Sequence, residues 1–220
     1  MGQTILTSRQ SDFLELAKGD PEIVNWFYFT GGTALSEFYM HHRYSEDIDL
    51  FTESDINDAE IDKLIQKAVR KLRAKNIRKR KISGLFIYEL QFDDGSLKID
   101  FANYPYKPVE TGILYGKLKV DSSYDICINK VYTILSRTQV RDYIDLYFAL
   151  KRNEFSLEQL LSRMEEKFGT VRDETYLGNQ LLKVIDLPRD YPRMLVPFSF
   201  DEMARFYQDL SRKLLSKRIR

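Results

Sequence analysis

Cysteine and histidine are scarce in this sequence of 220 residues, which contains one cysteine, Cys127, and two histidines. A single cysteine cannot form a disulfide within the chain, and it cannot build a thiolate zinc cluster. There is also no run of about eighteen apolar residues, so we expect no membrane span. Residues 1–20 lack the basic and apolar regions of a secretory signal. These absences predict a cytoplasmic protein that does not contact a membrane.

The composition is typical of a globular protein, with 43% hydrophobic and 30% charged residues. The net charge is only +1, but the charges are unevenly distributed. Residues 1–60 contain three Lys or Arg and twelve Asp or Glu, whereas residues 61–81 contain ten basic residues and one acidic residue. This distribution suggests a metal in the acidic segment and a polyanion at the basic one. The alternative is a solvated helix surface.

Hydrophobic periodicity predicts alternating helices and strands in the first half of the chain. We expect a first helix ending near Gly19, an aromatic strand in residues 26–32 and a helix over residues 33–41. A strand should follow at residues 47–52, and then a helix capped by Asp58 that ends near Asn76. Residues 82–101 predict a hairpin, because Asp94-Gly95 is a strong turn signal between two apolar strands.

From Ser122 onward the pattern becomes helical. Two apolar segments lie between residues 122 and 150, and amphipathic helices are expected at residues 156–168 and 200–217. A stretch bounded by Pro188 and Pro197 should separate these last two helices. The predicted fold class is therefore α+β, with an α/β part over residues 1–120 and a helical part over residues 121–220.

A pair of glycines marks the first candidate site. Gly31 and Gly32 lie at the predicted turn from strand to helix and place no side chain in the path of a phosphate. The helix that follows directs its free N–H groups toward that position. A Gly-Gly pair alone is common and is weak evidence for phosphate binding.

Three aspartates provide the second signal. Asp47 and Asp49 are two residues apart, so on a strand they share a face, while Ile48 points toward the core. Asp100 lies in a later strand with the same alternation and joins the pair if the strands are neighbours. Adjacent carboxylates repel each other unless a cation lies between them. Mg²⁺ suits such a site because it prefers oxygen ligands and retains water for substrate phosphates.

Three carboxylates can hold two Mg²⁺ ions about 3.5–4 Å apart, the spacing used for in-line phosphoryl displacement. In this interpretation Asp47 and Asp49 contact both ions. Asp100 contacts the ion that activates the acceptor hydroxyl, and it can accept the hydroxyl proton. For any one aspartate the ordinary alternative is a turn or surface residue.

The motifs resemble those of the AbiEii-type nucleotidyltransferase toxins, a group within the DNA polymerase β-like superfamily. The matching segments are GGTAL at residues 31–35 and HRYSEDIDLF at residues 42–51. Asp100, Lys130 and RDYIDL at residues 141–146 extend the resemblance to roughly residues 25–150. It implies a polymerase β-like mixed sheet with flanking helices, followed by a helical half, and an NTP as substrate.

The resemblance also implies roles for single residues. Thr33 would bind triphosphate through its hydroxyl or its backbone, and Arg43 and Ser45 would contact phosphates, the arginine as a bidentate fork. Lys130 would reach the triphosphate from across the cleft. Asp142 is counted in the family's active site.

Asp145 shares a helix face with Asp142 and would instead hold Arg141 or Lys130. A salt-bridge network between helices is the structural alternative for these residues. His42 is expected to hydrogen-bond the loop or a phosphate, because magnesium avoids imidazole.

The acceptor is left open by these residues. The leading hypothesis is transfer of a nucleoside monophosphate to an RNA, for example a tRNA end, or to a protein hydroxyl. The toxin role and a cognate antitoxin partner follow from the resemblance. The basic residues between Arg70 and Lys81 could guide a nucleic-acid backbone toward the cleft. The alternatives are a small-molecule acceptor, as in antibiotic nucleotidyltransferases, and a non-catalytic protein that binds NTP or RNA.

Overall fold

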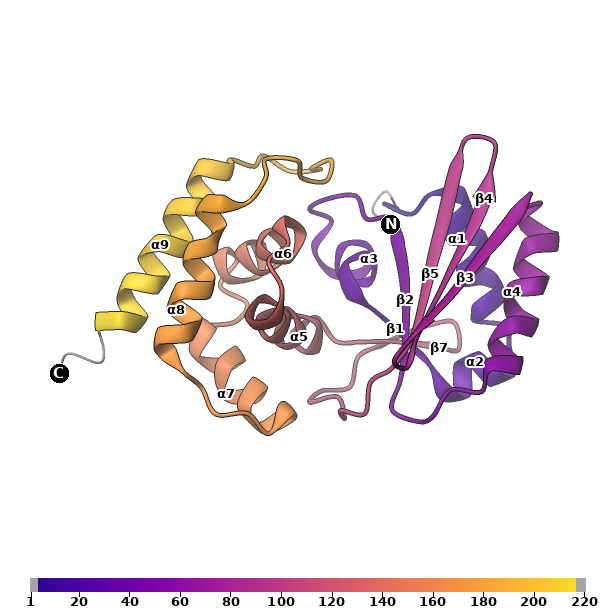
Figure 1. Cartoon of the computed structure of the whole chain (residues 1–220), viewed down its shortest axis with the longest axis horizontal. Helices are drawn as coiled ribbons and strands as arrows, with labels where there is room; N and C mark the ends of the chain where they lie inside the picture. Colours follow the sequence, from indigo (N-terminus) through magenta and orange to yellow (C-terminus); the bar gives the residue numbers. More distant parts are fainter. Residues whose placement is uncertain (1–3, 217–220) are drawn as a thin grey trace.

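A seven-stranded mixed sheet dominates the N-terminal half of the computed structural model, which describes residues 4–216 (Figure 1). The strand order is β3-β4-β5-β2-β1-β7-β6. β2 and β5 pair in parallel, as do β1 and β7, and the remaining neighbours are antiparallel. The strands are β1 (Tyr28–Thr30), β2 (Asp47–Thr52), β3 (Asn76–Ile82), β4 (Leu85–Phe92), β5 (Gly95–Asn103), β6 (Ile113–Tyr115) and β7 (Leu118–Val120).

Strand β2 shows how the sequence pattern creates two different faces of the sheet. Ile48 and Leu50 are fully buried, whereas Asp47 and Asp49 are partly exposed. Because side chains alternate along a strand, the two aspartates share one face and the two apolar residues share the other. The predicted alternation of residues 47–52 is confirmed.

Helices cover the sheet on both sides (Figure 1). α1 (Ser8–Ala17), α2 (Pro21–Trp26) and α4 (Asp58–Leu72) lie on the side away from the C-terminal half. The short helix α3 (Gly31–Leu35) continues into one π-helical turn, η1 (Ser36–Met40). These two lie between the sheet and the C-terminal helices and contact both.

Several boundaries differ from the prediction. Asn57, and not Asp58, caps α4 by accepting a hydrogen bond from the N–H of Ala59. The helix ends at Leu72 because Arg73 adopts a left-handed conformation, with φ 58°. Asn76 then begins β3, a strand that the prediction missed because its residues are almost all basic or polar.

The C-terminal half is helical, as predicted. Its elements are α5 (Ser123–Ser136), α6 (Val140–Lys151), α7 (Leu157–Phe168), α8 (Glu174–Leu182), the 3-10 turn η2 (Lys183–Asp186) and α9 (Phe200–Ser216). Helix α8 was not predicted, and Lys217 of the predicted last helix lies outside the described residues. Within residues 4–216 no helix is both long and apolar enough to span a membrane.

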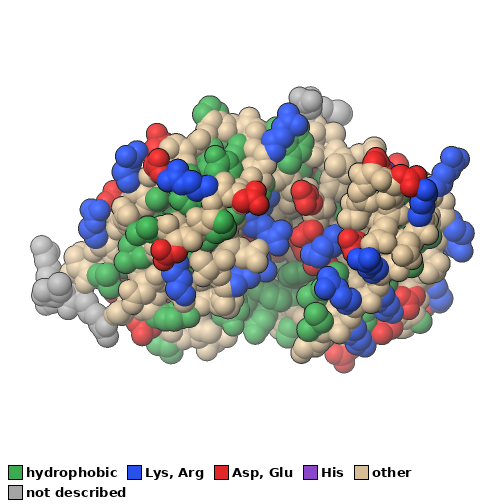
Figure 2. Space-filling model, turned by 45° about the horizontal axis from the view of Figure 1, so that its top comes forward, with side chains coloured by type: hydrophobic (Ala, Val, Ile, Leu, Met, Phe, Trp, Pro, Cys, Tyr) green, Lys and Arg blue, Asp and Glu red, His purple; other side chains and the backbone are tan. Residues whose placement is uncertain are grey.

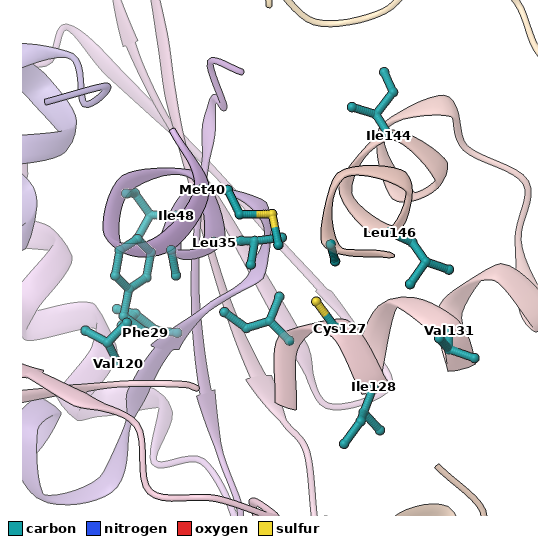
Figure 3. Packing of buried hydrophobic residues seen from close by; sticks show 14 of the residues in the cluster. Phe29, Leu35, Met40, Ile48, Val120, Cys127, Ile128, Val131, Ile144 and Leu146 are labelled. Atoms are coloured by element: carbon teal, nitrogen blue, oxygen red, sulfur yellow. The ribbon is translucent and has the colours of Figure 1, made fainter. Parts of the chain in front are cut away.

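The hydrophobic core is continuous between the two halves. One cluster of buried residues includes Phe29 of the sheet, Leu35 and Met40 of α3 and η1, and Cys127 of α5. Figure 3 shows Leu35 and Met40 lying between Phe29 and Cys127. Cys127 is part of this core, since it is 0% exposed.

The backbone of the proline-rich stretch also joins the two halves. Residues 193–195 hydrogen-bond to residues 42–44, with Tyr44 donating to the carbonyl of Arg193 and Leu195 donating to the carbonyl of His42. Both bonds are 2.9 Å long. This contact holds the loop that leads into β2.

Candidate active site

The three predicted aspartates lie together on the open face of the sheet. Asp49 of β2 is the register partner of Asp100 of β5, and Asp47 is the partner of Lys98. Directly paired residues of neighbouring strands point to the same side, with strands about 4.8 Å apart. The sequence grouped Asp100 with Asp47 and Asp49 only if their strands are neighbours. The structure meets this condition.

Basic side chains contact these carboxylates. The Nζ atom of Lys98 donates to Oδ2 of Asp100 at 2.8 Å and to Oδ2 of Asp47 at 3.2 Å. Arg141 of α6 donates to the same Asp47 oxygen at 3.2 Å. In this arrangement no group of three or more His, Cys, Asp and Glu side chains has the geometry of a metal site within residues 4–216.

Two observations nevertheless fit a divalent cation at this position. Oδ1 of Asp100 is buried and has no hydrogen-bond partner. Burial, followed by the charges of Asp100 and Asp47, raises the pKa of Asp49 to about 7. A carboxylate cluster with an unpaired buried oxygen and mutual repulsion has the donor chemistry that Mg²⁺ prefers.

The diglycine turn faces the carboxylates. Gly31 has φ +77°, and a Cβ atom placed there would lie 2.0 Å from Oδ2 of Asp49. A Cβ atom on Gly32 would lie 2.5 Å from Nη2 of Arg43 and 3.3 Å from Oγ of Ser45. At Gly31 both the positive φ and the contact with Asp49 disfavour a side chain, whereas a side chain at Gly32 would have to displace the guanidinium of Arg43.

Thr33 and Arg43 make contacts other than the predicted phosphate contacts. The hydroxyl of Thr33 donates to the carbonyl of Asp47, and its side chain is fully buried, which leaves only its backbone for a ligand. The bidentate fork of Arg43 binds Asp145, at 2.6 Å through Nε and 2.8 Å through Nη2. The third arm of Arg43 donates to the carbonyl of Tyr44. Arg43 therefore lies beside Gly32 and connects the diglycine turn to Asp145 of α6.

A buried ionic network connects this loop to the helical half. Asp145 of α6 is 0% exposed and accepts from His42, Arg43 and Lys130. Burial acts to raise the pKa of Asp145, but Arg43 and Lys130 hold it well below its ordinary value. The salt-bridge alternative considered for this motif is present. The ring of His42 contacts Asp145 and Ser36 and not the loop that the prediction gave as one of its two partners.

Asp142 extends the network to the cleft. Its carboxylate accepts from Lys130 at 2.7 Å and from Arg137 at 3.0 Å. Lys130 donates to Asp142 and Asp145, and an ammonium group has three donors. The charge of Lys130 also acts to lower the pKa of Asp49, against the larger effects of burial and of the neighbouring aspartates.

A cleft of about 390 Å³ contains these groups, within the size range of small-molecule sites. Beyond the carboxylates its lining includes basic and hydroxyl side chains, and also an aromatic wall in which the rings of Phe51 and Tyr104 are 5.2 Å apart. Figure 2 shows acidic and basic side chains around the hollow between the two halves. Lys98, Arg137 and the aromatic wall were missed as site residues. Only Lys98 gave a signal, through its position two residues before Asp100.

Comparison with known proteins agrees with this geometry. The profile of a family described as "Nucleotidyl transferase AbiEii toxin, Type IV TA system" matches residues 19–214. The chain belongs to this family. The match covers the sheet, the cleft and nearly all of the helical half, so the AbiEii resemblance extends beyond the predicted residues 25–150.

Individual relatives of this AbiEii-family chain are distant. "Uncharacterized protein aq_aa25" of Aquifex aeolicus (strain VF5) is 25% identical over 190 residues, which cover 84% of this chain and 86% of that protein. The crystal structure of JHP933 from Helicobacter pylori has a TM-score of 0.58 at 20% identity and covers 96% of this chain and 94% of its own. A second H. pylori structure, provisionally assigned as a nucleotidyltransferase, has the same TM-score and identity and covers 96% and 97%. At this identity the two structures establish the nucleotidyltransferase fold.

Proposed function

We propose that this protein transfers a nucleoside monophosphate from a Mg²⁺-bound NTP to a hydroxyl of an RNA or protein. The observation that carries the proposal is the pairing of Asp49 with Asp100, with Asp47 on the same face, opposite the diglycine turn. This places a carboxylate cluster against the turn, within a cleft of about 390 Å³. We further propose that the protein acts in the cytoplasm as the toxin of a toxin–antitoxin pair, with a cognate antitoxin as partner.

Asp47, Asp49 and Asp100 would hold the magnesium, with two ions as the expected number. Bound Mg²⁺ supplies positive charge that stabilises the phosphoryl oxygens during in-line displacement. To bind it, Asp47 and Asp100 must exchange their contacts with Lys98 for the metal. Lys98 remains beside them as a counter-charge.

The chain's own residues position the NTP. Backbone N–H groups at Gly31 and Gly32 face the triphosphate, and Lys130, Arg137 and Arg141 neutralise it from the helical side. Side chains of Arg137 and Arg141 are 49% and 41% exposed, so they can reach a ligand. The aromatic wall of Phe51 and Tyr104 suits the base.

In the transfer step the acceptor oxygen forms a bond to the α-phosphorus while the bond to the bridging oxygen breaks and pyrophosphate leaves. The hydroxyl proton passes to Asp100. Burial raises the pKa of Asp100, although Lys98 opposes this effect, and a raised pKa makes the carboxylate a better proton acceptor.

The test is label transfer from each α-labelled NTP, with Mg²⁺ and either total RNA or a protein lysate. We expect label in one macromolecular fraction with the wild type and none with Asp49→Asn, because the amide cannot provide the same charge. Asp201→Asn, a change at an exposed carboxylate, is the matched control and should retain full transfer. Absence of label with every NTP would refute the enzymatic proposal. Induced expression should arrest growth with the wild type and with Asp201→Asn, but not with Asp49→Asn.

A further inference from the structure

The face that carries the aspartates extends outward over three more strands. Register pairing connects Asp49 to Asp100, then to Ile87 of β4 and Arg80 of β3. A parallel row connects Asp47 to Lys98, Glu89 and Arg78. Since paired residues share a face, Arg78 and Arg80 lie on the same open face as the carboxylates, at the outer edge of the sheet.

The basic segment is thereby divided between two faces. Lys79 and Lys81 alternate with the arginines and point to the helix side. There Lys79 pairs with Asp62 of α4 at 2.8 Å, and Lys81 pairs with Asp58 at 3.2 Å. Their charges are neutralised within the fold.

The arginines of the open face are left with little compensation. Arg78 has only a long contact of 3.8 Å to Glu89, and its side chain is 68% exposed. Arg80 is exposed and has no hydrogen bond or ion pair with any residue in the described range 4–216. The two guanidinium groups are therefore free to bind an external anion.

An apolar row accompanies the charged ones. Phe51, which lines the cleft, connects through Ala102 and Leu85 to Ile82, which is 57% exposed. Exposed apolar area beside guanidinium groups suits the faces of bases and sugars next to phosphates. The combination of these guanidinium groups with exposed apolar area favours an RNA acceptor, whose backbone phosphates recur at short intervals, over a protein acceptor.

We propose that the acceptor is an RNA strand whose backbone crosses the open face of β5, β4 and β3, with Arg78 and Arg80 holding its phosphates. This inference rests on the proposed function and specifies the acceptor. Arg80 lies two strands from Asp100, roughly 10 Å away at ordinary strand spacing. That interval is a few nucleotides of one strand, so a reactive terminal hydroxyl at Asp100 and a phosphate at Arg80 belong to one short segment.

The experiment compares two double variants that remove the same charge from the same strand. Arg78→Ser with Arg80→Ser changes the open face, and Lys79→Ser with Lys81→Ser changes the helix face. Binding of a short fluorescein-labelled RNA of mixed sequence, with a single-stranded 3′ end, is measured by anisotropy over a range of salt concentrations without NTP. Circular dichroism confirms that both variants are folded.

We expect the arginine variant to bind RNA about tenfold more weakly and its salt slope to fall by about two, one for each lost phosphate contact. The lysine variant should behave like the wild type. In the transfer assay only the arginine variant should lose labelling of RNA, while its NTP binding by calorimetry is unchanged.

Equal losses in both variants, or no loss in either, would overturn the proposal. Label in a protein acceptor that is unaffected by the arginine changes would also overturn it, while leaving nucleotidyl transfer intact. If the wild type transfers nothing, the proposed function fails, and the anisotropy comparison still decides whether the open face binds RNA.

Discussion

Replacing Asp145 by asparagine should destabilise the protein more than any comparable change at a surface carboxylate. The side chain is fully buried and accepts four hydrogen bonds or ion pairs, at 2.6–2.9 Å, from His42, Arg43 and Lys130. Asparagine retains the shape but removes the charge, which leaves the guanidinium of Arg43 buried with only uncharged oxygen partners, among them the carbonyl of Tyr44.

The magnitude follows from the cost of an uncompensated buried charge. Breaking a buried ion pair by removing one partner costs about 3–5 kcal/mol. For a chain of this length each kcal/mol lowers the melting temperature by about 2–4 °C, so the midpoint should fall by roughly 6–20 °C. Because the pKa of Asp145 is held well below its ordinary value, this contribution is fully present at neutral pH and is lost only as strong acid protonates the folded state.

The assay is urea unfolding at pH 7 followed by circular dichroism, with thermal melting in parallel. Asp201→Asn is the matched control, since Asp201 pairs with Arg189 at 2.7 Å while both side chains are more than 60% exposed. Such exposed pairs contribute less than about 1 kcal/mol. If Asp145→Asn loses no more stability than Asp201→Asn, the network does not stabilise the fold as inferred here.

Three further predictions concern single residues. Gly31→Ala should abolish nucleotidyl transfer, because the added Cβ would meet Asp49 at 2.0 Å, whereas Gly169→Ala, also at positive φ but with nothing within 4 Å, should retain it. Lys98→Met should tighten Mn²⁺ binding measured by electron paramagnetic resonance without NTP, since its ammonium competes for two carboxylates; unchanged affinity would contradict this. Burial and then Asp125 raise the pKa of Asp121 to about 7. Because the folded protein holds this proton more tightly than the unfolded chain, the wild type should lose stability relative to Asp121→Asn as the pH rises from about 4 to 7. Urea unfolding at a series of pH values measures this difference.

The chemistry of the site could be predicted because it depends on local patterns. Alternation around Ile48 and the turn at Asp94-Gly95 identify β2, β4 and β5, and two of these strands, β2 and β5, carry the aspartates. The sequence could not show that β2 and β5 are neighbours, since strand order depends on long-range pairing. The structure shows this through the register of Asp49 with Asp100.

Two kinds of feature could not be predicted. The centre of strand β3 is a run of four basic residues, in which no apolar alternation marks a strand. Its two faces differ only in the fold, where Asp58 and Asp62 of α4 lie opposite the lysines. The role of Arg43 depends on competition between a substrate phosphate and a buried carboxylate more than 100 positions away. The contact of Arg43 with Asp145 was not predicted, and its contact with a substrate phosphate stays a prediction.

The backbone contact between residues 193–195 and residues 42–44 has a consequence for biosynthesis. The segment that hydrogen-bonds to the loop ahead of β2 is synthesised about 150 residues after that loop. A nascent chain that has emerged only as far as α8 contains every proposed metal ligand and the proposed proton acceptor. Its residues 42–44 still lack the hydrogen bonds to residues 193–195. The loop that precedes the proposed metal ligands therefore gains these two backbone hydrogen bonds only after residues 193–195 have been synthesised.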